Sequence, residues 1–225
     1  MTAPGEPAYD VAHLLGGAML LVGFAMLGQR RLMPLIGALA AQGVLLALAA
    51  FWQGHVQGAP QLYLTGLIAL LAKGIVIPLV LRRLAAELPP PLRAEAPGGV
   101  ALAMVLGVGL VGLAVLVVVP ATAGAGAGAL ARVSLATALS ILLLGALMMV
   151  TRRSALAHVA GLLTIENGLI LAAVGVAGMP LVVELSAGGL VLVVALIAGV
   201  FARQMRERFA TLDPGVLDRH RGEGR

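Results

Sequence analysis

The stretch LYLTGLIALLAKGIVIPLVLRRL, residues 62–84, decides the fold class of this chain. It is an apolar run that is interrupted by a single lysine, Lys73, and closed by the pair Arg82 and Arg83. A helix needs roughly 20 apolar residues to cross a bilayer. The stretch lacks the alternation of polar and apolar residues that a membrane barrel strand requires. It therefore predicts a transmembrane helix with an ionisable group near its centre.

The rest of the chain has the same character. Its 225 residues are 60% hydrophobic and 11% charged, with a mean hydropathy of +1.05, which excludes an ordinary soluble domain. We predict an all-α, polytopic membrane protein in the cell (inner) membrane. Its seven transmembrane helices are expected at residues 11–28, 32–52, 62–81, 100–119, 130–150, 155–177 and 181–202. The absence of cysteine excludes disulfides, thiolate metal sites and iron-sulfur ligation by this chain.

The basic residues predict the topology. Thirteen of the fifteen follow the first, third, fifth and seventh predicted helices: Arg30, Arg31, Arg82, Arg83, Arg93, Arg152, Arg153, Arg203, Arg206, Arg208, Arg219, Arg221 and Arg225. Lys and Arg of short loops collect on the cytoplasmic side, so we place the N-terminus outside and the C-terminus in the cytoplasm. These clusters account for the net charge of +5 and give no reason to expect a nucleic-acid partner.

A proline-rich segment predicts how the chain is divided. Residues 86–99 contain Pro89, Pro90 and Pro91, which cannot continue a helix. We expect this segment to be a cytoplasmic linker between a three-helix membrane part, residues 1–85, and a four-helix membrane part, residues 100–202. Residues 203–225 are polar and form the predicted cytoplasmic tail.

Three ionisable side chains are the strong cases of a charge well inside a predicted span: Lys73, Glu166 and Glu184. Each costs at least about 2.5 to 3.5 kcal/mol in lipid, so each marks a functional hypothesis. We predict a proton relay through these residues, with Gln42 and His158 as weaker members. A structural alternative is an ion pair between Lys73 and Glu166 that holds the two membrane parts together. Glu184 can instead be a hydrated residue near the outer interface, and His158 a solvated residue near a helix end.

Other polar and small residues predict packing. Gly161, Gly168 and Gly175 recur every seven residues, which lets a second helix approach closely. The hydroxyls of Ser134, Thr137 and Ser140 share one helix face and can bond to their own backbone or to a neighbour. Pro78 is expected to distort its helix just beyond Lys73.

Two stretches carry a resemblance to a known family: TRRSALAHVAGLLTIENGLILAAV, residues 151–174, and GMPLVVELSAGGLVLVVALIAGVFARQMRERFATLD, residues 178–213. Together with residues 62–84 they resemble hydrogenase-4 component E, a membrane subunit of group 4 hydrogenase and formate hydrogenlyase-type complexes. The last three predicted helices are also similar to subunit K of NADH-quinone oxidoreductase. In that alignment Glu166 falls about one turn after the first subunit K glutamate, and Glu184 about two turns before the second. Leu190 stands where the family carries an aspartate.

The resemblance implies a non-catalytic subunit that lines a proton path and couples electron transfer to ion movement. Its partners would be antiporter-like and quinone-oxidoreductase-like membrane subunits and a peripheral hydrogenase or dehydrogenase arm with iron-sulfur clusters. The chain itself would bind no cofactor or metal.

Three alternatives remain open. The first is a stand-alone secondary transporter, although the predicted helices show no inverted repeat. The second is a structural scaffold that has lost the relay, which the leucine at position 190 suggests. The third is a photoreceptor with a Schiff base on Lys73, but seven aromatic residues are few for a chromophore pocket. The sequence does not decide which redox complex is involved or whether protons or sodium ions move.

Overall fold

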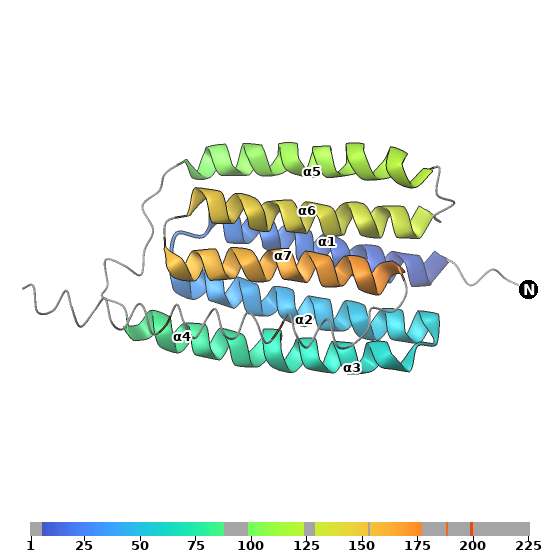
Figure 1. Ribbon diagram of the computed structural model, residues 1–225, viewed down its shortest axis with the longest axis horizontal. Coiled ribbons are helices and arrows are strands. Elements are labelled where there is room, and N and C mark those ends of the chain that lie inside the picture. The colour runs from blue at the N-terminus through green and yellow to red at the C-terminus, as the bar shows by residue number, and fades with distance from the viewer. Residues whose placement is uncertain are drawn as a thin grey trace, which may run out of the picture.

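The computed structural model describes residues 6–87, 99–123, 129–152 and 154–176, together with Gly188 and Gly199. The elements in these ranges are α1 (Glu6–Gly28), α2 (Leu32–Gln57), α3 (Pro60–Ala69), the π-helix η1 (Leu70–Val76), α4 (Ile77–Glu87), α5 (Val100–Ala123), α6 (Ala129–Thr151) and α7 (Ala155–Val176). The elements α3, η1 and α4 follow one another without a break and form one long rod (Figure 1).

Six helical segments are long and apolar enough to cross a membrane: Asp10–Gly28, Leu32–Gln57, Pro60–Ala86, Val100–Ala123, Arg132–Thr151 and Leu156–Gly175. The prediction of a helical protein with several helices long and apolar enough to cross a membrane is therefore confirmed for the described residues. The seventh predicted span, residues 181–202, lies outside them except for two glycines, and Glu184 and Leu190 lie outside them as well. A Cβ on Gly199 would lie 2.7 Å from Leu84 Cδ2 of α4.

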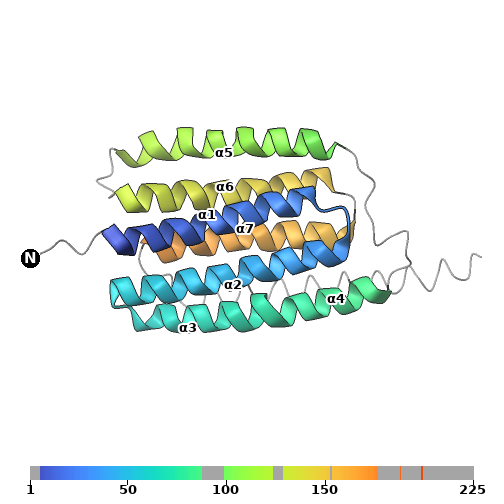
Figure 2. The same ribbon diagram turned by 180° about the vertical axis from the view of Figure 1, so that it is seen from behind.

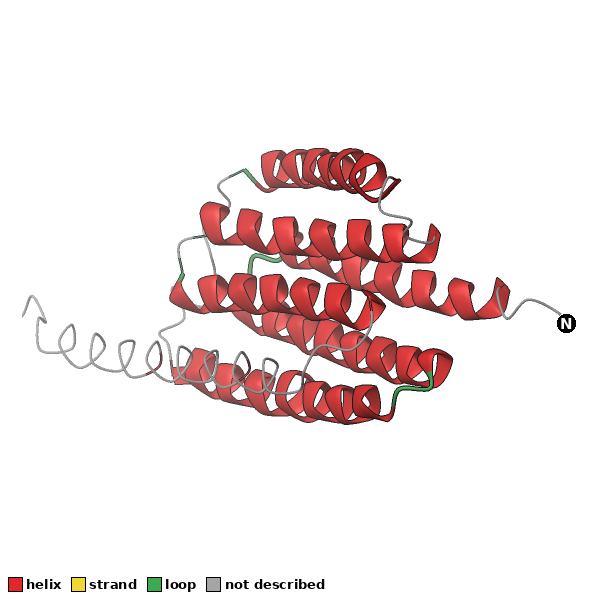
Figure 3. Ribbon diagram, turned by 45° about the vertical axis from the view of Figure 1, so that its right-hand side comes forward, coloured by secondary structure: helices red, strands yellow, loops and turns green. Residues whose placement is uncertain are grey.

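The helices form one bundle in which the predicted N-terminal and C-terminal parts are interleaved. In Figures 1 and 2, α5 lies along one edge against α6, and the α3–η1–α4 rod lies along the opposite edge against α2. Between these edges, α1 contacts α6 and α2 contacts α7 (Figure 3). Helices 100 residues apart in the sequence are thus neighbours, so a residue of η1 can meet a residue of α7.

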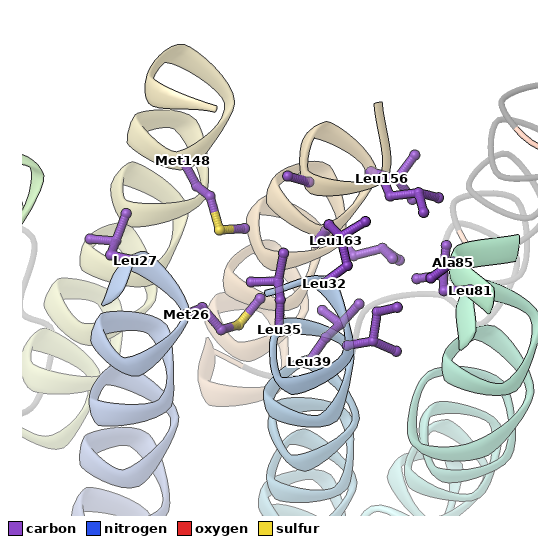
Figure 4. Packing of buried hydrophobic residues seen from close by; sticks show 14 of the residues in the cluster. Met26, Leu27, Leu32, Leu35, Leu39, Leu81, Ala85, Met148, Leu156 and Leu163 are labelled. Carbon is purple, nitrogen blue, oxygen red and sulfur yellow. The ribbon is translucent and has the colours of Figure 1, made fainter. Parts of the chain in front are cut away.

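The apolar core lies between the inner helices. Figure 4 shows one end of it, where α1, α2, α4, α6 and α7 converge with Met26, Leu27, Leu32, Leu35, Leu39, Leu81, Ala85, Met148, Leu156 and Leu163. The outward faces are also apolar: Leu21 of α1 is 71% exposed and Leu116 of α5 is 72% exposed. Because lipid tails are as apolar as leucine, these faces need no protein partner in a bilayer. Apolar residues alone therefore do not set the helix order.

Glycines let α6 and α7 approach each other closely. A Cβ on Gly161 would lie 2.9 Å from the carbonyl oxygen of Gly145, and one on Gly168 would lie 2.8 Å from that of Ala138. A Cβ on Gly175 would lie 3.2 Å from Ser134 Cβ. The predicted small-residue stripe on residues 161, 168 and 175 is therefore confirmed, and its partner is α6.

Replacing Gly168 with alanine is expected to lower the free energy of unfolding by about 1 to 3 kcal/mol, because the added Cβ has backbone atoms as its nearest neighbours. The matched control is Gly109→Ala on α5, where a Cβ meets nothing within 4 Å. The control should be neutral or stabilising, since alanine is the better helix former. Unfolding in mixed detergent micelles measures both. Equal stability of the two variants would contradict the close α6–α7 contact.

Polar groups near the helix ends and on α6 have local roles. The hydroxyls of Thr137 and Ser140 donate to the carbonyls of Val133 and Ala136, 2.9 and 2.7 Å away on their own helix. Of the two alternatives that the sequence left open for this face, these two residues therefore bond to their own backbone. The Arg152 guanidinium donates to the carbonyl oxygen of Leu27, 2.7 Å away at the end of α1. A cation at a helix C-terminus satisfies free carbonyls, so Arg152 also ties α6 to α1.

Candidate functional site: a buried polar layer

The lysine that interrupts the third predicted span lies in the middle of a π-helix. Lys73 is flanked by three residues of η1 on each side. Pro78 follows η1 closely and has no N–H to donate to Gly74, four residues earlier. The sequence predicted a distortion of this helix just beyond Lys73. In the structure the distortion is the π-helix, and it includes Lys73. π-Helical turns are rare and occur frequently at functional sites.

A glycine on α2 lets that helix approach the backbone of η1 at Lys73. A Cβ on Gly43 would lie 2.7 Å from the Lys73 carbonyl carbon and 2.8 Å from its oxygen. Any larger residue at position 43 would push the two backbones apart. The contact places Gln42, the neighbour of Gly43, at the same depth as Lys73. Sequence reasoning did not single out Gly43, because it lies on no glycine repeat.

The structure brings Lys73 and Glu166 together across η1 and α7. Lys73 Nζ lies 3.2 Å from Glu166 Oε1. Lys73 is 6% exposed and Glu166 is 7% exposed, so both are buried within the protein rather than directed at lipid. The geometry therefore provides the counter-charge that each group needs at this depth.

The amides of Asn167 and Gln42 extend this contact across the bundle. Lys73 Nζ donates to Asn167 Oδ1 at 3.2 Å, and Asn167 Nδ2 donates to Gln42 Oε1 at 3.2 Å. Gln42 Nε2 then donates to the carbonyl oxygen of Met19 at 3.4 Å. Asn167 and Gln42 are fully buried. The four side chains form a polar layer that joins η1, α7, α2 and α1, and we call Asn167 and Gln42 the amide arm.

The polar layer lies near mid-depth of the bundle. Glu166 is near the middle of α7 (Ala155–Val176), and Lys73 is about midway along the rod from Pro60 to Glu87. At 1.5 Å of rise per residue, Glu166 is roughly 15 Å from either end of its helix. These side chains cannot reach the interface by snorkelling, so their polar groups depend on one another.

The two sides of the layer differ in how well they are satisfied. In the amide arm, the oxygen and the nitrogen of both Asn167 and Gln42 each take part in a hydrogen bond. Glu166 Oε1 lies within ion-pair distance of Lys73 Nζ, but the angles of this contact are not those of a hydrogen bond. Within the described part of the chain, neither Glu166 oxygen accepts a hydrogen bond. The carboxylate therefore has acceptor capacity that its protein neighbours do not use, as a group that takes up a proton requires.

Lys73 is the only lysine in the sequence, and the other fourteen basic residues are arginines. The two types differ in chemistry, because an amine can release its proton whereas a guanidinium stays protonated in proteins. Arginine performs the roles of interface charge and helix capping in this chain, as Arg152 illustrates. Of the fifteen Lys and Arg side chains, the one that can release its proton is thus the one held beside a buried carboxylate.

The remaining predicted site residues are placed differently. Gln42 joins the layer. The ring of His158 is half-buried, with Nδ1 2.9 Å from the Ser154 carbonyl oxygen, and it lies eight residues before Glu166 on α7. That spacing corresponds to about 12 Å along the helix axis, so His158 does not touch the layer. Glu184 lies outside the described residues.

Sequence reasoning missed Asn167 as a member of the site. The sequence did contain a signal for it, because Asn167 is a polar residue directly after Glu166 in a mostly apolar helix. In the described residues no three His, Cys, Asp or Glu side chains form a group that could hold a metal ion. The layer consists of one ion pair and the hydrogen bonds of two amides.

Comparison with known proteins gives a relative but no function. The chain is 28% identical over 199 residues to an uncharacterized protein of Mycobacterium tuberculosis, Rv0085, and the match covers 88% of this chain and 90% of that protein. No protein-family profile matches the chain. No solved structure matches it either. The similarity to the mycobacterial protein extends over nearly the whole length of both chains, so it includes the region of the polar layer.

Proposed function

We propose that this protein is a non-catalytic membrane subunit of a hydrogenase-4-like or complex I-like redox complex, and that Lys73 and Glu166 carry a proton in its path of ion movement. The observation that carries the proposal is the pairing of the single lysine with a buried carboxylate at 3.2 Å in mid-bundle. Buried ionisable groups in membrane helices are expensive, and they mark proton relays and ion pathways.

The pair supplies a defined chemical step. A proton on the Lys73 ammonium moves to a Glu166 oxygen: one N–H bond breaks, one O–H bond forms, and the charged pair becomes an amine and a carboxylic acid. Both states are neutral overall, so the step creates no net charge in lipid. Proton movement further along the path then requires a donor or acceptor beyond the pair, and Glu184 is the candidate from the sequence.

The partners follow from the resemblance of residues 62–84, 151–174 and 178–213 to hydrogenase-4 component E. We place the subunit in the cell (inner) membrane with seven spans, the N-terminus outside and the C-terminus in the cytoplasm. It would lie between an antiporter-like and a quinone-oxidoreductase-like subunit. A chain without cysteine depends on a peripheral hydrogenase or dehydrogenase arm for the iron-sulfur clusters of electron transfer.

A purely structural scaffold is the second candidate, because the polar layer joins η1, α7, α2 and α1 whether or not a proton moves. A stand-alone transporter is a third, and it predicts ion transport by the purified chain in liposomes, which a subunit should lack.

Glu166→Gln is expected to lower the number of protons pumped per electron pair by about tenfold or more, because an amide keeps the shape of the side chain and cannot accept the proton. Proton uptake and electron transfer are measured in membrane vesicles of the native host, and copurified partners report assembly. Thr164→Val is the matched control, since Thr164 is also buried on α7 and donates only to its own helix and the Met26 sulfur among the described residues. Normal pumping by assembled Glu166→Gln would refute the relay.

A further inference from the structure

The direction of every hydrogen bond in the amide arm is determined by its two ends. At one end, Asn167 turns its oxygen toward Lys73 Nζ, which is the orientation that favours an ammonium because an ammonium can only donate. At the other end, the Met19 carbonyl can only accept, so Gln42 must turn its nitrogen toward it. Asn167 Nδ2 is then left facing Gln42 Oε1, which is the bond observed. The two requirements agree, and no amide of the arm can flip without losing a bond.

This direction gives the arm an electrical polarity. Both amide oxygens lie on the side of the arm nearer Lys73, and both amide nitrogens lie on the side away from it. The two side-chain dipoles are therefore aligned head to tail, with the negative end at Nζ. In a buried environment of low dielectric, aligned hydrogen bonds polarise and strengthen one another. The arm stabilises positive charge on Lys73 without carrying a formal charge itself.

The carboxylate side of the pair has no equivalent support among the described residues. Neither oxygen of Glu166 accepts a hydrogen bond there, although a charged carboxylate is most stable when donors surround it. A pair with so little support for the carboxylate would be expected to relax to an amine and a carboxylic acid. Asn167 and, behind it, Gln42 oppose that transfer because they stabilise the ammonium.

We propose that Asn167 and Gln42 keep the proton of the pair on Lys73 in the resting protein. This inference deepens the proposed function, on which its biological meaning rests, because it assigns the position from which the relay starts. Asn167 and Gln42 act here as positioning residues: they do not carry the proton, and they decide which partner holds it.

The single lysine makes the proposal measurable in the full chain. Labelling with ¹⁵N-lysine gives one Nζ signal in solid-state NMR of the protein in lipid bilayers, and ammonium and amine nitrogens have separate chemical shifts. The wild type should show ammonium at neutral pH. Asn167→Leu should lower the ammonium-to-amine ratio at every pH of a titration series by roughly tenfold or more, since a hydrogen bond to a charged group is lost. Gln42→Leu should change the ratio in the same direction by less.

Two further variants separate charge from packing. Asn167→Asp keeps an oxygen at Lys73 Nζ and adds negative charge, so it should retain the ammonium. If altered packing caused the effect of Asn167→Leu, Asn167→Asp should lower the ammonium-to-amine ratio as well. Thr164→Val, one turn away on α7 and outside the arm, should leave the wild-type signal. An amine in the wild type, or an unchanged ammonium in Asn167→Leu, overturns the proposal. If Asn167→Leu does not fold, the same measurement on Gln42→Leu decides: an unchanged ratio there overturns it.

The outcome is independent of the pumping experiment. The NMR measurement uses the protein alone, without partners or turnover. An unchanged ammonium in Asn167→Leu together with lost pumping in Glu166→Gln rejects the arm and keeps the relay. A changed ratio together with normal pumping keeps the arm and rejects the relay.

Discussion

Replacing Glu166 with leucine is expected to lower the free energy of unfolding by about 3 to 5 kcal/mol. The substitution leaves the Lys73 ammonium buried without its carboxylate, and removal of one partner of a buried ion pair has this cost. It is the largest stability effect we expect from a single substitution in this chain. Unfolding of the purified protein in mixed detergent micelles measures it.

The double variant Lys73→Met/Glu166→Leu is the decisive companion. Apolar residues of similar size often replace a buried ion pair without loss of stability, so the double variant should regain most of what Glu166→Leu loses. If the pair only holds helices together, the double variant should also regain proton pumping in the assembled complex. If the pair is a relay, pumping should stay at the level of Glu166→Gln. A double variant as unstable as Glu166→Leu would contradict the assignment of the instability to an unpaired charge.

Replacing Lys73 with arginine is expected to reduce coupled proton transfer by about tenfold or more while assembly is retained. Arginine keeps the positive charge and can still pair with Glu166, but its guanidinium does not release a proton near neutral pH. Arginine occupies fourteen of the fifteen Lys and Arg positions, so it is the usual residue of this chain where only a positive charge is needed. Protons pumped per electron pair, with partner copurification as the assembly measure, test the expectation.

Arginine is longer and planar, so a control must separate size from chemistry. Lys73→Gln has a shorter side chain that still donates to Asn167, and it too cannot carry the proton as an ammonium does. Loss of pumping in both variants, with both assembled, points to proton release by Lys73. Normal pumping in Lys73→Arg would show that only the positive charge matters and would favour the structural scaffold.

The sequence was sufficient to predict the class of fold, for a simple physical reason. A helix that crosses lipid must satisfy its backbone internally and present about 20 apolar residues, so each span is visible in the local sequence. Six of the predicted spans correspond to helices of the structure. The stripe of Gly161, Gly168 and Gly175 was also predictable, because its seven-residue period places the three on one face. Its partner helix, α6, was not.

The composition of the site was only partly predictable. Lys73, Glu166 and Gln42 stand out in the sequence because a polar group in an apolar run is costly wherever it points. Asn167 carried the same kind of signal as Gln42 and was missed, whereas Gly43 does not stand out because it is one of 30 glycines. The π-helix at Lys73 also left no signal beyond Pro78. This π-helix is also the place where α2 comes close at Gly43.

What the sequence by itself determined is therefore that this protein has apolar helices of membrane-spanning length and that a few polar groups are buried among them. Only the tertiary structure decided which of those groups meet. Lys73 Nζ and Glu166 Oε1 are 3.2 Å apart, although the two residues are 93 positions apart in the sequence. In a bilayer, an apolar helix face gains little from packing against protein instead of lipid, because lipid tails are as apolar as leucine. The order of the helices, and with it the polar layer, depends on glycine contacts and on polar groups that must find one another away from water.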